Sequence, residues 1–355
     1  MAMGFGILGA GMISSLHADA LRNSPKARLV AVCDVARERA EKLVREFAPE
    51  AKAYTDLDAL LADPAVEVVN IVTPNALHTD AVVAAAKAGK HVLCEKPPAM
   101  SLADTDRMIE ACRQADRKLG VFVQCRLREP IRQIRRALDE GRFGRLLRVD
   151  AAMKWYRTTE YYRSDAWRSD RRSGAGVTIQ HAFHYIDLLQ YLAGPADSVH
   201  ARMTNLGHPD IPIEDTVDAM IEFQNGVIGS IAASTALWPG ADVRIEVFGE
   251  AGAAIMQGTA MALWKFREER PEDEAIRHCG NAAVATAAGS ATALPSIDHQ
   301  MVIDDCVDAI QSGREVAIPC QSVRPALEIS LAMYRSARLG EPVRLPLIDE
   351  ETVWD

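Results

Sequence analysis

The first 34 residues constrain the fold of this chain more than any other stretch. Phe5 to Leu8 form a short apolar run, Gly9-Ala-Gly11-Met-Ile-Ser14 follows directly, and apolar residues from Leu16 to Arg22 have helical spacing. A second apolar run, Arg28 to Cys33, ends at Asp34. A strand, a tight glycine turn, a helix and a second strand in this order predict a β-α-β unit that binds a nucleotide.

The small residues of this turn have separate roles. Gly9 permits the tight turn, and Gly11 lets backbone amides approach a pyrophosphate without an intervening Cβ. Ser14 occupies the third small position, where helix and strand pack closely. The first helical turn then presents unpaired N–H groups and the positive end of the helix dipole. An isolated motif of this kind also occurs in ordinary strand-to-helix turns, but the flanking strands favour a dinucleotide site.

Asp34 predicts which dinucleotide binds. It lies 23 residues beyond Gly11, near the distance expected for a carboxylate that accepts hydrogen bonds from the ribose hydroxyls. A carboxylate there repels a 2′-phosphate and favours NAD, whereas Arg37 and Arg39 weaken the preference and keep NADP as the alternative. The residues of this unit expected to bind the cofactor are Gly9, Ala10, Gly11, Met12, Ile13 and Asp34.

Alternating strands and helices over residues 4–125 predict a doubly wound parallel sheet, with Ser101 capping its last helix and Val121 to Cys125 as its last strand. Ligands of such sheets bind at the C-terminal ends of the strands. Further loops expected at that edge contain Thr73, Pro74, Asn75 and His78, then Glu95, Lys96 and Pro97, and finally Gln124. We therefore expect these loops and the glycine turn to surround one crevice. The loop residues expected to bind the cofactor there are Thr73, Pro74, Asn75, His78, Glu95 and Lys96.

The pattern changes after residue 145. The segments expected as strands are Leu146–Trp155, Ser198–Thr204, Val217–Phe223, Val227–Thr235 and Val243–Gly249. One strong helix, Val177 to Leu192, interrupts them. This half predicts an α+β domain built on a largely antiparallel open sheet. Because apolar residues occur on both faces of these strands, we expect a homodimer or a homotetramer.

Length and charge set the domain number and exclude one class of partner. A chain of 355 residues suggests about two domains. We expect dinucleotide binding in 1–124 and substrate binding with oligomerisation in 125–355, where a helix near 325–339 packs back toward the first domain. The net charge of −9 argues against a nucleic-acid partner, and the basic-rich stretch from Arg126 to Arg148 also contains acidic residues. We interpret that stretch as a solvated helix face or a subunit contact.

The seven cysteines indicate the compartment. They are scattered, without a CxxC pair or metal-ligand spacing, so we expect no metal site and a reducing cytoplasm. No apolar run approaches about 18 residues, and no secretion signal precedes the first strand. We therefore expect no membrane partner.

Four motifs resemble those of one enzyme family. They are Gly9-Ala-Gly11, Thr73-Pro74-Asn75 followed by His78, Glu95-Lys96-Pro97, and Gly174-Ala-Gly176-Val-Thr-Ile-Gln180-His-Ala-Phe-His184-Tyr-Ile-Asp187-Leu-Leu. In these motifs the chain is similar to the glucose-fructose oxidoreductase, inositol dehydrogenase and MocA (Gfo/Idh/MocA) group of NAD(P)-dependent sugar and polyol oxidoreductases. The resemblance implies a Rossmann domain followed by an α+β domain. It also implies hydride transfer between nicotinamide and a secondary alcohol or ketone of a sugar, sugar acid or cyclic polyol.

The resemblance implies catalytic roles for Lys96 and His184. Oxidation of a secondary alcohol needs a base for the hydroxyl proton, and histidine titrates nearest neutral pH. A lysine ammonium hydrogen-bonded to the same oxygen stabilises the developing alkoxide. Gln180 stands where many members carry Asp or Asn, one helical turn before His184 and on the same face. It can bind a hydroxyl at the catalytic centre but cannot accept a proton as a carboxylate would.

Two neighbours of His184 have open roles. His181 is either a substitute proton acceptor or a structural or solvent-facing histidine. Asp187 orients His184 or Lys96, or else it forms a buried structural hydrogen bond.

Aromatic and arginine side chains at the start of the second half suggest a carbohydrate site. Aromatic faces stack on sugar rings and guanidinium groups bind hydroxyls or carboxylates, although core packing or a subunit contact explains the same residues equally well. The expected substrate-binding residues are Lys96, Gln124, Tyr156, Arg157, Trp167, Arg168, Gln180, His181 and His184, with His299 as a weaker candidate.

Three functions follow from these residues. The leading one is a dehydrogenase of a free, carbohydrate-like alcohol. The second is a dehydrogenase of a nucleotide-linked sugar or uronic acid, which Arg157, Arg163 and Arg168 would serve. The third is a dinucleotide-binding sensor without turnover, although the presence of Lys96 and His184 argues against it.

Overall fold

Two structural units make up the chain, and they are not two continuous halves. The computed structural model describes residues 2–280, 288, 295–348 and 353–354. Unit 1 comprises Met1–Gln124 and Pro295–Arg324, and unit 2 comprises Cys125–Leu294 and Pro325–Asp355. The first division falls at the expected position after residue 124. The expectation of one continuous second domain was wrong, because residues 295–324 belong to unit 1.

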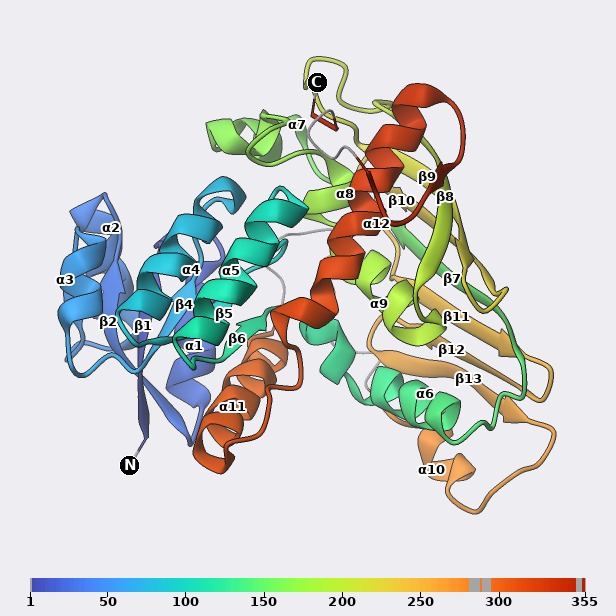
Figure 1. Ribbon diagram of the computed structural model, residues 1–355, viewed down its shortest axis with the longest axis horizontal. Helices are drawn as coiled ribbons and strands as arrows, with labels where there is room; N and C mark the ends of the chain where they lie inside the picture. The colour runs from blue at the N-terminus through green and yellow to red at the C-terminus, as the bar shows by residue number, and fades with distance from the viewer. Residues whose placement is uncertain (1, 281–287, 289–294, 349–352, 355) are drawn as a thin grey trace. The chain divides into compact units, whose positions relative to one another are not determined.

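Unit 1 contains the doubly wound parallel sheet, in the order β3-β2-β1-β4-β5-β6 (Figure 1). Its strands are β1 (Met3–Leu8), β2 (Ala27–Cys33), β3 (Lys52–Tyr54), β4 (Val68–Ile71), β5 (His91–Cys94) and β6 (Leu119–Val121). The helices between them are α1 (Ser14–Asn23), α2 (Arg37–Phe47), α3 (Leu57–Ala62), η1 (Asn75–Leu77), α4 (His78–Lys87) and α5 (Leu102–Gln114). Every residue of β1 is buried, as a central strand covered on both faces requires. The strand order reverses between β1 and β4, so a ligand crevice is expected beyond their C-terminal ends.

Local sequence explains where several of these elements begin and end. The Ser101 hydroxyl accepts the Asp104 N–H at 3.1 Å, so the predicted cap of α5 is confirmed. The predicted strand Val121 to Cys125 was wrong beyond its first residue. Phe122 N–H still pairs with the Cys94 carbonyl, but Val123 N–H turns back to the Val121 carbonyl at 2.9 Å. The next residues form a short 3-10 helix, η2 (Gln124–Leu127).

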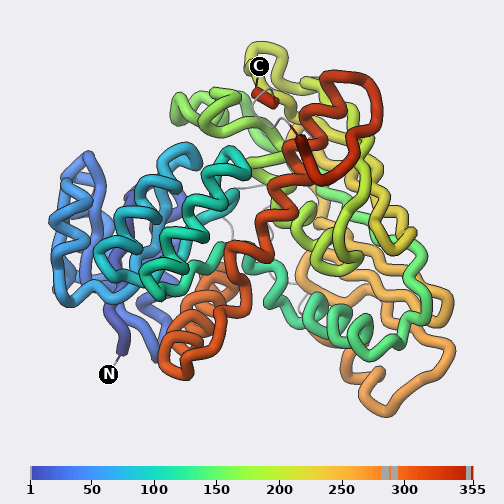
Figure 2. The backbone as a smooth tube through the Cα atoms, in the orientation of Figure 1, coloured from blue at the N-terminus to red at the C-terminus, as the bar shows by residue number. Residues whose placement is uncertain are grey.

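A late segment of the chain completes unit 1. Helix α11 (Ile297–Ser312) lies beside α1, and in Figure 2 its orange-red tube is next to the blue N-terminal segments. The Lys26 ammonium contacts the Asp308 carboxylate at 2.6 Å, and the Ser24 hydroxyl donates to Asp304 at 2.5 Å. These contacts join residues about 280 positions apart, which explains why no local pattern revealed them.

Unit 2 is built on an eight-stranded sheet, in the order β13-β12-β11-β7-β10-β9-β8-β14. Its strands are β7 (Leu146–Lys154), β8 (Ala196–Thr204), β9 (Thr216–Phe223), β10 (Ile228–Ser234), β11 (Arg244–Gly249), β12 (Gly252–Gln257), β13 (Ala260–Phe266) and β14 (Val343–Arg344). All neighbours are antiparallel except β7 and β10, so the predicted sheet type is confirmed. The sequence did not predict the last three strands. In β12 the reason is a start rich in glycine and alanine, which disfavour strands.

The predicted helix from Val177 to Leu192 was wrong, because the structure has two helices there. They are α8 (Val177–Gln180) and α9 (Phe183–Ala193). His181 departs from helical geometry with φ −125° and ψ −51°. Both helices pack against the sheet through β10. Along β9 buried and exposed residues alternate, so the opposite face of that strand lacks such cover.

The remaining helices of unit 2 are α6 (Glu129–Asp139), α7 (Thr159–Arg163), η3 (Ala166–Ser169) and α10 (Asp273–Arg277). Helix α12 (Cys320–Leu339) begins five residues before the expected Pro325, which lies inside it, and the division between the units falls within it. Among the described residues, no helix combines the length and the apolar character needed to cross a membrane.

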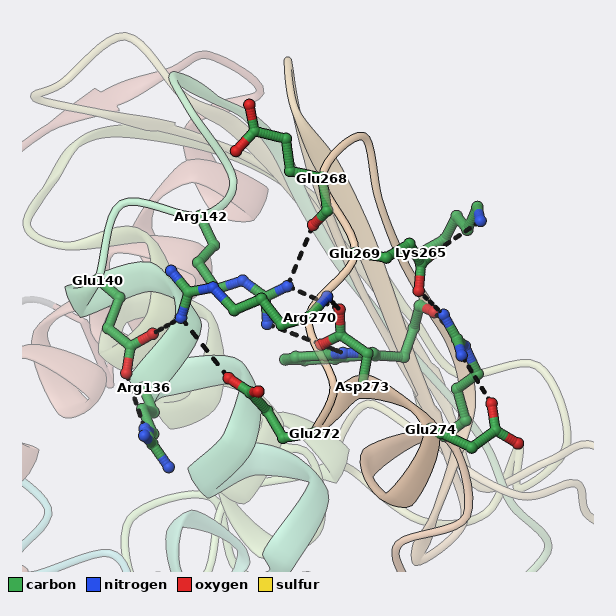
Figure 3. A network of polar contacts seen from close by, with 12 residues as sticks. Arg136, Glu140, Arg142, Lys265, Glu268, Glu269, Arg270, Glu272, Asp273 and Glu274 are labelled. Carbon is green, nitrogen blue, oxygen red and sulfur yellow. Dashed lines mark hydrogen bonds and ion pairs between the residues drawn. The ribbon is translucent and has the colours of Figure 1, made fainter.

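Asp273 is the centre of a polar network in unit 2 (Figure 3). Its two carboxylate oxygens each lie 2.8 Å from the Arg142 guanidinium. Trp264 Nε1–H and the Arg270 backbone N–H also donate to it, both at 2.7 Å. The Arg142 hydrogen bonds lower the pKa of Asp273 against a smaller opposing effect of burial. The network ties the residues that follow α6 to β13 and α10.

Asp273→Asn is expected to lower the free energy of unfolding by about 2 kcal/mol at pH 7, because a buried charge-assisted pair becomes neutral on one side. The folded pKa lies below the ordinary value of 3.8, so the carboxylate stabilises the fold above that pH. This stabilisation disappears as the pH falls through the folded pKa. Urea unfolding at pH 7 and pH 3 measures both effects.

The control is Asp197→Asn, since Asp197 forms an exposed pair with Arg344. Its unfolding free energy should stay within about 0.5 kcal/mol of the wild type. Equal acid sensitivity of the wild type and Asp273→Asn would contradict the role given to Asp273.

Candidate active site

The glycine turn between β1 and α1 has the geometry of a dinucleotide site. Gly9 has φ +99°, and a Cβ there would lie 2.6 Å from the Val72 carbonyl oxygen. A Cβ on Gly11 would meet no described atom within 4 Å, so its backbone is open to a ligand. Ala10, Met12 and Ile13 complete the turn, and no described side chain caps the N-terminus of α1. Ser14 N–H and Leu16 N–H donate to the Gly11 and Ile13 carbonyl oxygens, so an anion would approach the turn chiefly at the open Gly11 backbone.

Asp34 stands at the end of β2 and faces this turn. Its Oδ2 accepts the Ala10 N–H at 2.7 Å, and its Oδ1 accepts the Ala36 N–H at 2.8 Å. The carboxylate thus ties the glycine turn to the loop before α2. Each oxygen keeps a second lone pair, so the group is oriented and can still accept a ribose hydroxyl. Arg37 instead lies 3.7 Å from Glu41 on the exposed surface of α2.

The loops after β4 and β6 bring polar atoms to the same edge of the sheet. The Thr73 hydroxyl follows β4, and the Gln124 side chain follows β6. Thr73 Oγ1 and Gln124 Oε1 are buried and have no hydrogen-bond partner among the described residues. Buried polar atoms are rarely left in this state unless a ligand or water completes them. Pro74 and Asn75 lie between β4 and α4, where η1 begins at Asn75.

The sequence predicts that His78 binds the cofactor, but in the structure its side chain contacts the protein interior instead. Its ring is fully buried. Nδ1 lies 2.9 Å from the Pro97 carbonyl oxygen, and Nε2 lies 3.0 Å from the Thr73 carbonyl oxygen. Burial lowers the pKa of His78, although these carbonyl contacts oppose the shift. The residue therefore connects the loop after β4 to the loop after β5.

Glu95 forms a buried cluster with two histidines from distant parts of the chain. His17 Nε2, from α1, lies 2.9 Å from Glu95 Oε1. His299 Nε2, from α11, lies 3.6 Å from the same oxygen. Burial alone would raise the pKa of Glu95, but its interactions with His17 and His299 hold that pKa well below the ordinary value. Sequence patterns gave no role to His17 and only a weak substrate role to His299, which is 2% exposed.

Lys96 follows directly in the loop after β5. Its backbone N–H donates to Glu95 Oε2 at 3.1 Å. The other carboxylate oxygen of Glu95, Oε1, is hydrogen-bonded to His17. The peptide bond between Lys96 and Pro97 is cis. Lys96 is partly exposed, unlike the proline that follows it.

His184 lies in the first turn of α9 and is partly exposed, whereas its neighbours Phe183 and Tyr185 are buried. Gln180 lies in α8 and not in the same helix, so the predicted common helix face was wrong. Its Nε2 donates to the carbonyl oxygens of Arg168 at 2.6 Å and Ala175 at 2.5 Å. The amide of Gln180 therefore holds the segment before α8 in place, and its catalytic role stays a prediction.

Of the alternatives predicted for Asp187, the structure shows the buried structural hydrogen bond. Its carboxylate is fully buried and contacts the Arg126 guanidinium through both oxygens, with Nε at 2.7 Å. Burial raises the pKa of Asp187, although Arg126 opposes the shift. The Tyr191 ring lies below the guanidinium, with its centroid 4.7 Å from Cζ. Asp187 therefore holds η2 against α9.

Aromatic rings and two buried guanidinium groups meet in unit 2. Arg168 Cζ lies 4.9 Å from the Tyr161 ring centroid and 4.6 Å from that of Trp167. Arg157 Cζ lies 5.1 Å from the Trp155 ring centroid. We call Trp155, Arg157, Tyr161, Trp167, Arg168 and His181 the aromatic-arginine cluster; His181 is 5% exposed and its ring lies 5.6 Å from that of Tyr161. Tyr156 lies beside it and is partly exposed.

A histidine-aspartate pair supports this cluster, and no sequence motif indicated it. His208 Nδ1 and Asp215 Oδ2 lie 2.8 Å apart, and His208 Nε2 lies 2.8 Å from the Arg157 carbonyl oxygen. The Asp215 hydrogen bond raises the pKa of His208. The pair fixes the backbone at Arg157.

Two family models match the chain. The first, described as an oxidoreductase family with an NAD-binding Rossmann fold, matches residues 3–123. The second, described as the GFO/IDH/MocA C-terminal domain, matches residues 131–255.

Individual relatives are similar over most of the chain. Myo-inositol 2-dehydrogenase of Thermotoga maritima is 32% identical over 256 residues, which cover 70% of this chain and 74% of that protein. The scyllo-inositol 2-dehydrogenase (NAD(+)) of Bacillus subtilis is 27% identical over 96% of this chain and 95% of its own length. The crystal structure of the WlbA dehydrogenase of Bordetella pertussis, in complex with NADH and UDP-GlcNAcA, matches this chain with a TM-score of 0.85 and 30% sequence identity. The match covers 98% of this chain and 100% of the WlbA chain.

Proposed function

This chain belongs to the GFO/IDH/MocA family of oxidoreductases, and from that membership we propose that it transfers hydride between NAD and a secondary alcohol of a free cyclic polyol or small sugar. The observation that carries the proposal is the edge of the sheet in unit 1. A glycine turn, an oriented carboxylate, unpartnered buried oxygens and Lys96 occur there together. The inositol dehydrogenases among the relatives supply the substrate class.

The residues at this edge fit a dinucleotide. The open backbone at Gly11 and the uncapped start of α1 would hold the pyrophosphate, and Asp34 would accept the ribose hydroxyls. Thr73 and Gln124 would direct their unpartnered oxygens to the remaining polar groups. When bound, NAD supplies a nicotinamide ring that accepts hydride.

Asp34→Asn is expected to lower the preference for NAD over NADP, measured as the ratio of kcat/KM values, by about tenfold. Asparagine keeps one acceptor oxygen but removes the charge that repels a 2′-phosphate. The matched control is Asp58→Asn, because Asp58 is an exposed acidic residue in α3. This variant should leave the ratio unchanged. An unchanged ratio in Asp34→Asn would show that another residue selects the nucleotide.

Lys96 and His184 would perform the proton chemistry. In oxidation, His184 takes the hydroxyl proton, and its partly exposed ring can pass that proton to water. The Lys96 ammonium donates a hydrogen bond to the oxygen on which negative charge develops. Gln180 would bind a substrate hydroxyl without taking its proton, and Tyr156 and the aromatic-arginine cluster would contact the sugar ring.

A nucleotide-linked sugar acid is the second candidate substrate. Arg157 and Arg168 are 4% and 8% exposed, and desolvation lowers the pKa of Arg157. Guanidinium groups held in this way suit a carboxylate or a diphosphate better than neutral hydroxyls. The similarity to the WlbA dehydrogenase, whose structure contains UDP-GlcNAcA, also supports this candidate.

A substrate panel separates these functions. NADH formation would be followed with myo-inositol, scyllo-inositol and levoglucosan, and in parallel with UDP-linked N-acetylglucosaminuronic acid. Turnover of a free polyol or sugar supports the leading proposal, and turnover of the UDP-linked acid alone supports the second. NAD binding without turnover of any member would favour a sensor, and failure to bind NAD or NADP at millimolar concentration would refute the proposal.

We also propose that the protein is a homodimer or homotetramer in the cytoplasm. The exposed face of β9 and β10 carries Met220 and Ile228, which are 45% and 41% exposed. Such a face is suited to a second copy of the chain. All seven cysteines are free, which suits a reducing compartment. A monomeric mass by light scattering at micromolar concentration would contradict the assembly.

A further inference from the structure

Two buried histidines contact Glu95, the residue that precedes the proposed catalytic lysine. His17 is 0% exposed in α1 and His299 is 2% exposed in α11. Both rings pack on Phe122, with centroid separations of 4.5 Å for His17 and 5.5 Å for His299. Neither ring is accessible to substrate. A role for them must therefore act through a neighbour.

That neighbour is Glu95. Both rings direct Nε2 toward Glu95 Oε1, at 2.9 Å and 3.6 Å. The Nδ1 atoms of both rings have no hydrogen-bond partner among the described residues. Glu95 is thus the polar group that sets the orientation of each ring, and each ring in turn restrains the carboxylate.

The restraint continues from Glu95 to Lys96. While Glu95 Oε1 is hydrogen-bonded to His17 and in ionic contact with His299 at 3.6 Å, Oε2 accepts the Lys96 backbone N–H at 3.1 Å. On the other side, the Pro97 carbonyl lies 2.9 Å from His78 Nδ1. The Lys96 backbone is therefore held from the residue before it and the residue after it. A lysine side chain is long and flexible, so a fixed starting point is what limits the positions of its ammonium group.

We propose that His17 and His299 are positioning residues that fix the backbone of Lys96 through the Glu95 carboxylate. The catalytic meaning of this role rests on the proposed function, but the restraint on the backbone does not. The segment 295–324, which belongs to unit 1, then helps to position Lys96, because its helix α11 supplies the His299 ring. A shift of about 1 Å in a reacting group can cost about a hundredfold in rate.

The test replaces each histidine with phenylalanine. His17→Phe and His299→Phe keep an aromatic ring against Phe122 and remove the nitrogen that faces Glu95. His91→Phe is the matched control, because His91 begins the strand β5 after which Glu95 follows, and its Nδ1 accepts the Lys118 N–H at 3.0 Å. Circular dichroism and thermal melting establish that each variant is folded.

Hydrogen exchange gives a readout that needs no activity. A peptide over residues 95–100 reports few amides, because Pro97 and Pro98 have none. The Glu95 N–H is held by the Ile71 carbonyl, whereas the Lys96 N–H depends on the Glu95 carboxylate. We expect the Lys96 amide to exchange about tenfold faster in His17→Phe and His299→Phe, and at the wild-type rate in His91→Phe.

Steady-state kinetics give the second readout. In both variants kcat should fall about tenfold to a hundredfold, while the Kd for NADH, measured by fluorescence, changes less than about threefold. With a substrate deuterated at the carbinol carbon, the isotope effect on kcat should increase, because hydride transfer becomes slower than product release. Loss of kcat only in proportion to lost NADH affinity would overturn the proposal.

The outcomes distinguish this proposal from the proposed function. If the wild type turns over no substrate, the proposed function fails, yet the exchange rate of the Lys96 amide still decides whether the two histidines hold the backbone. Unchanged Lys96 exchange in both folded variants overturns the proposal. Stoichiometric zinc in the purified protein that is lost in either variant would also overturn it, because His17, Glu95 and His299 would then be metal ligands.

Discussion

Lys96→Met lowers kcat by about 10²–10³-fold and leaves NAD+ binding within about twofold of the wild type. Methionine keeps most of the side-chain volume but removes the ammonium group that would stabilise the developing alkoxide. The nucleotide contacts are assigned to the glycine turn and Asp34, so they are not altered. Steady-state kinetics on the best substrate of the panel and titration calorimetry with NAD+ measure the two effects separately.

The matched control for this variant is Lys87→Met, since Lys87 is an exposed residue at the end of α4. Its kcat should equal that of the wild type. If Lys96→Met raised KM alone and kept kcat, Lys96 would bind ground state and transition state equally, and its assigned catalytic role would be refuted.

Arg126→Leu lowers the free energy of unfolding by about 3–5 kcal/mol, the largest loss of stability that we expect from a single substitution. Asp187 is 0% exposed, so the variant leaves a carboxylate buried without the guanidinium that compensates it. Burial already raises the pKa of Asp187 in the presence of Arg126. Chemical denaturation at neutral pH measures the change.

The double variant Arg126→Leu with Asp187→Leu tests the cause of this loss. Two apolar side chains remove the uncompensated charge, so the double variant should be more stable than Arg126→Leu alone. A double-mutant cycle then gives the interaction energy of the pair. If the losses of the single variants simply add, the Arg126 guanidinium stabilises the fold through its stacking on Tyr191 and not through Asp187.

The parts of the site that sequence could predict are those set by local spacing. The glycine turn and Asp34 belong to one β-α-β unit, and the structure joins them directly through the Ala10 N–H. The rule that parallel strands end at one edge also predicted the loops containing Thr73 and Lys96. In each case the chemistry follows from residues close in sequence or from the sheet topology.

The parts that sequence could not predict depend on contacts between distant segments. His17 looks like an ordinary helix residue, and its partner Glu95 lies 78 positions away. His299 comes from α11, whose helical pattern does not indicate the unit on which it packs. The helix expected from Val177 divides at His181, whose backbone departs from helical geometry, and the spacing of apolar residues does not indicate such a break.

The most direct test of the central claim is transfer of the hydrogen itself. Purified protein would be mixed with NAD+ and the panel sugars and polyols, each deuterated at its secondary carbinol carbons, and the nucleotide analysed by NMR. We expect deuterium from at least one of these substrates to appear at C4 of the nicotinamide. NAD+ that binds to the protein but acquires no deuterium from any of them would contradict it.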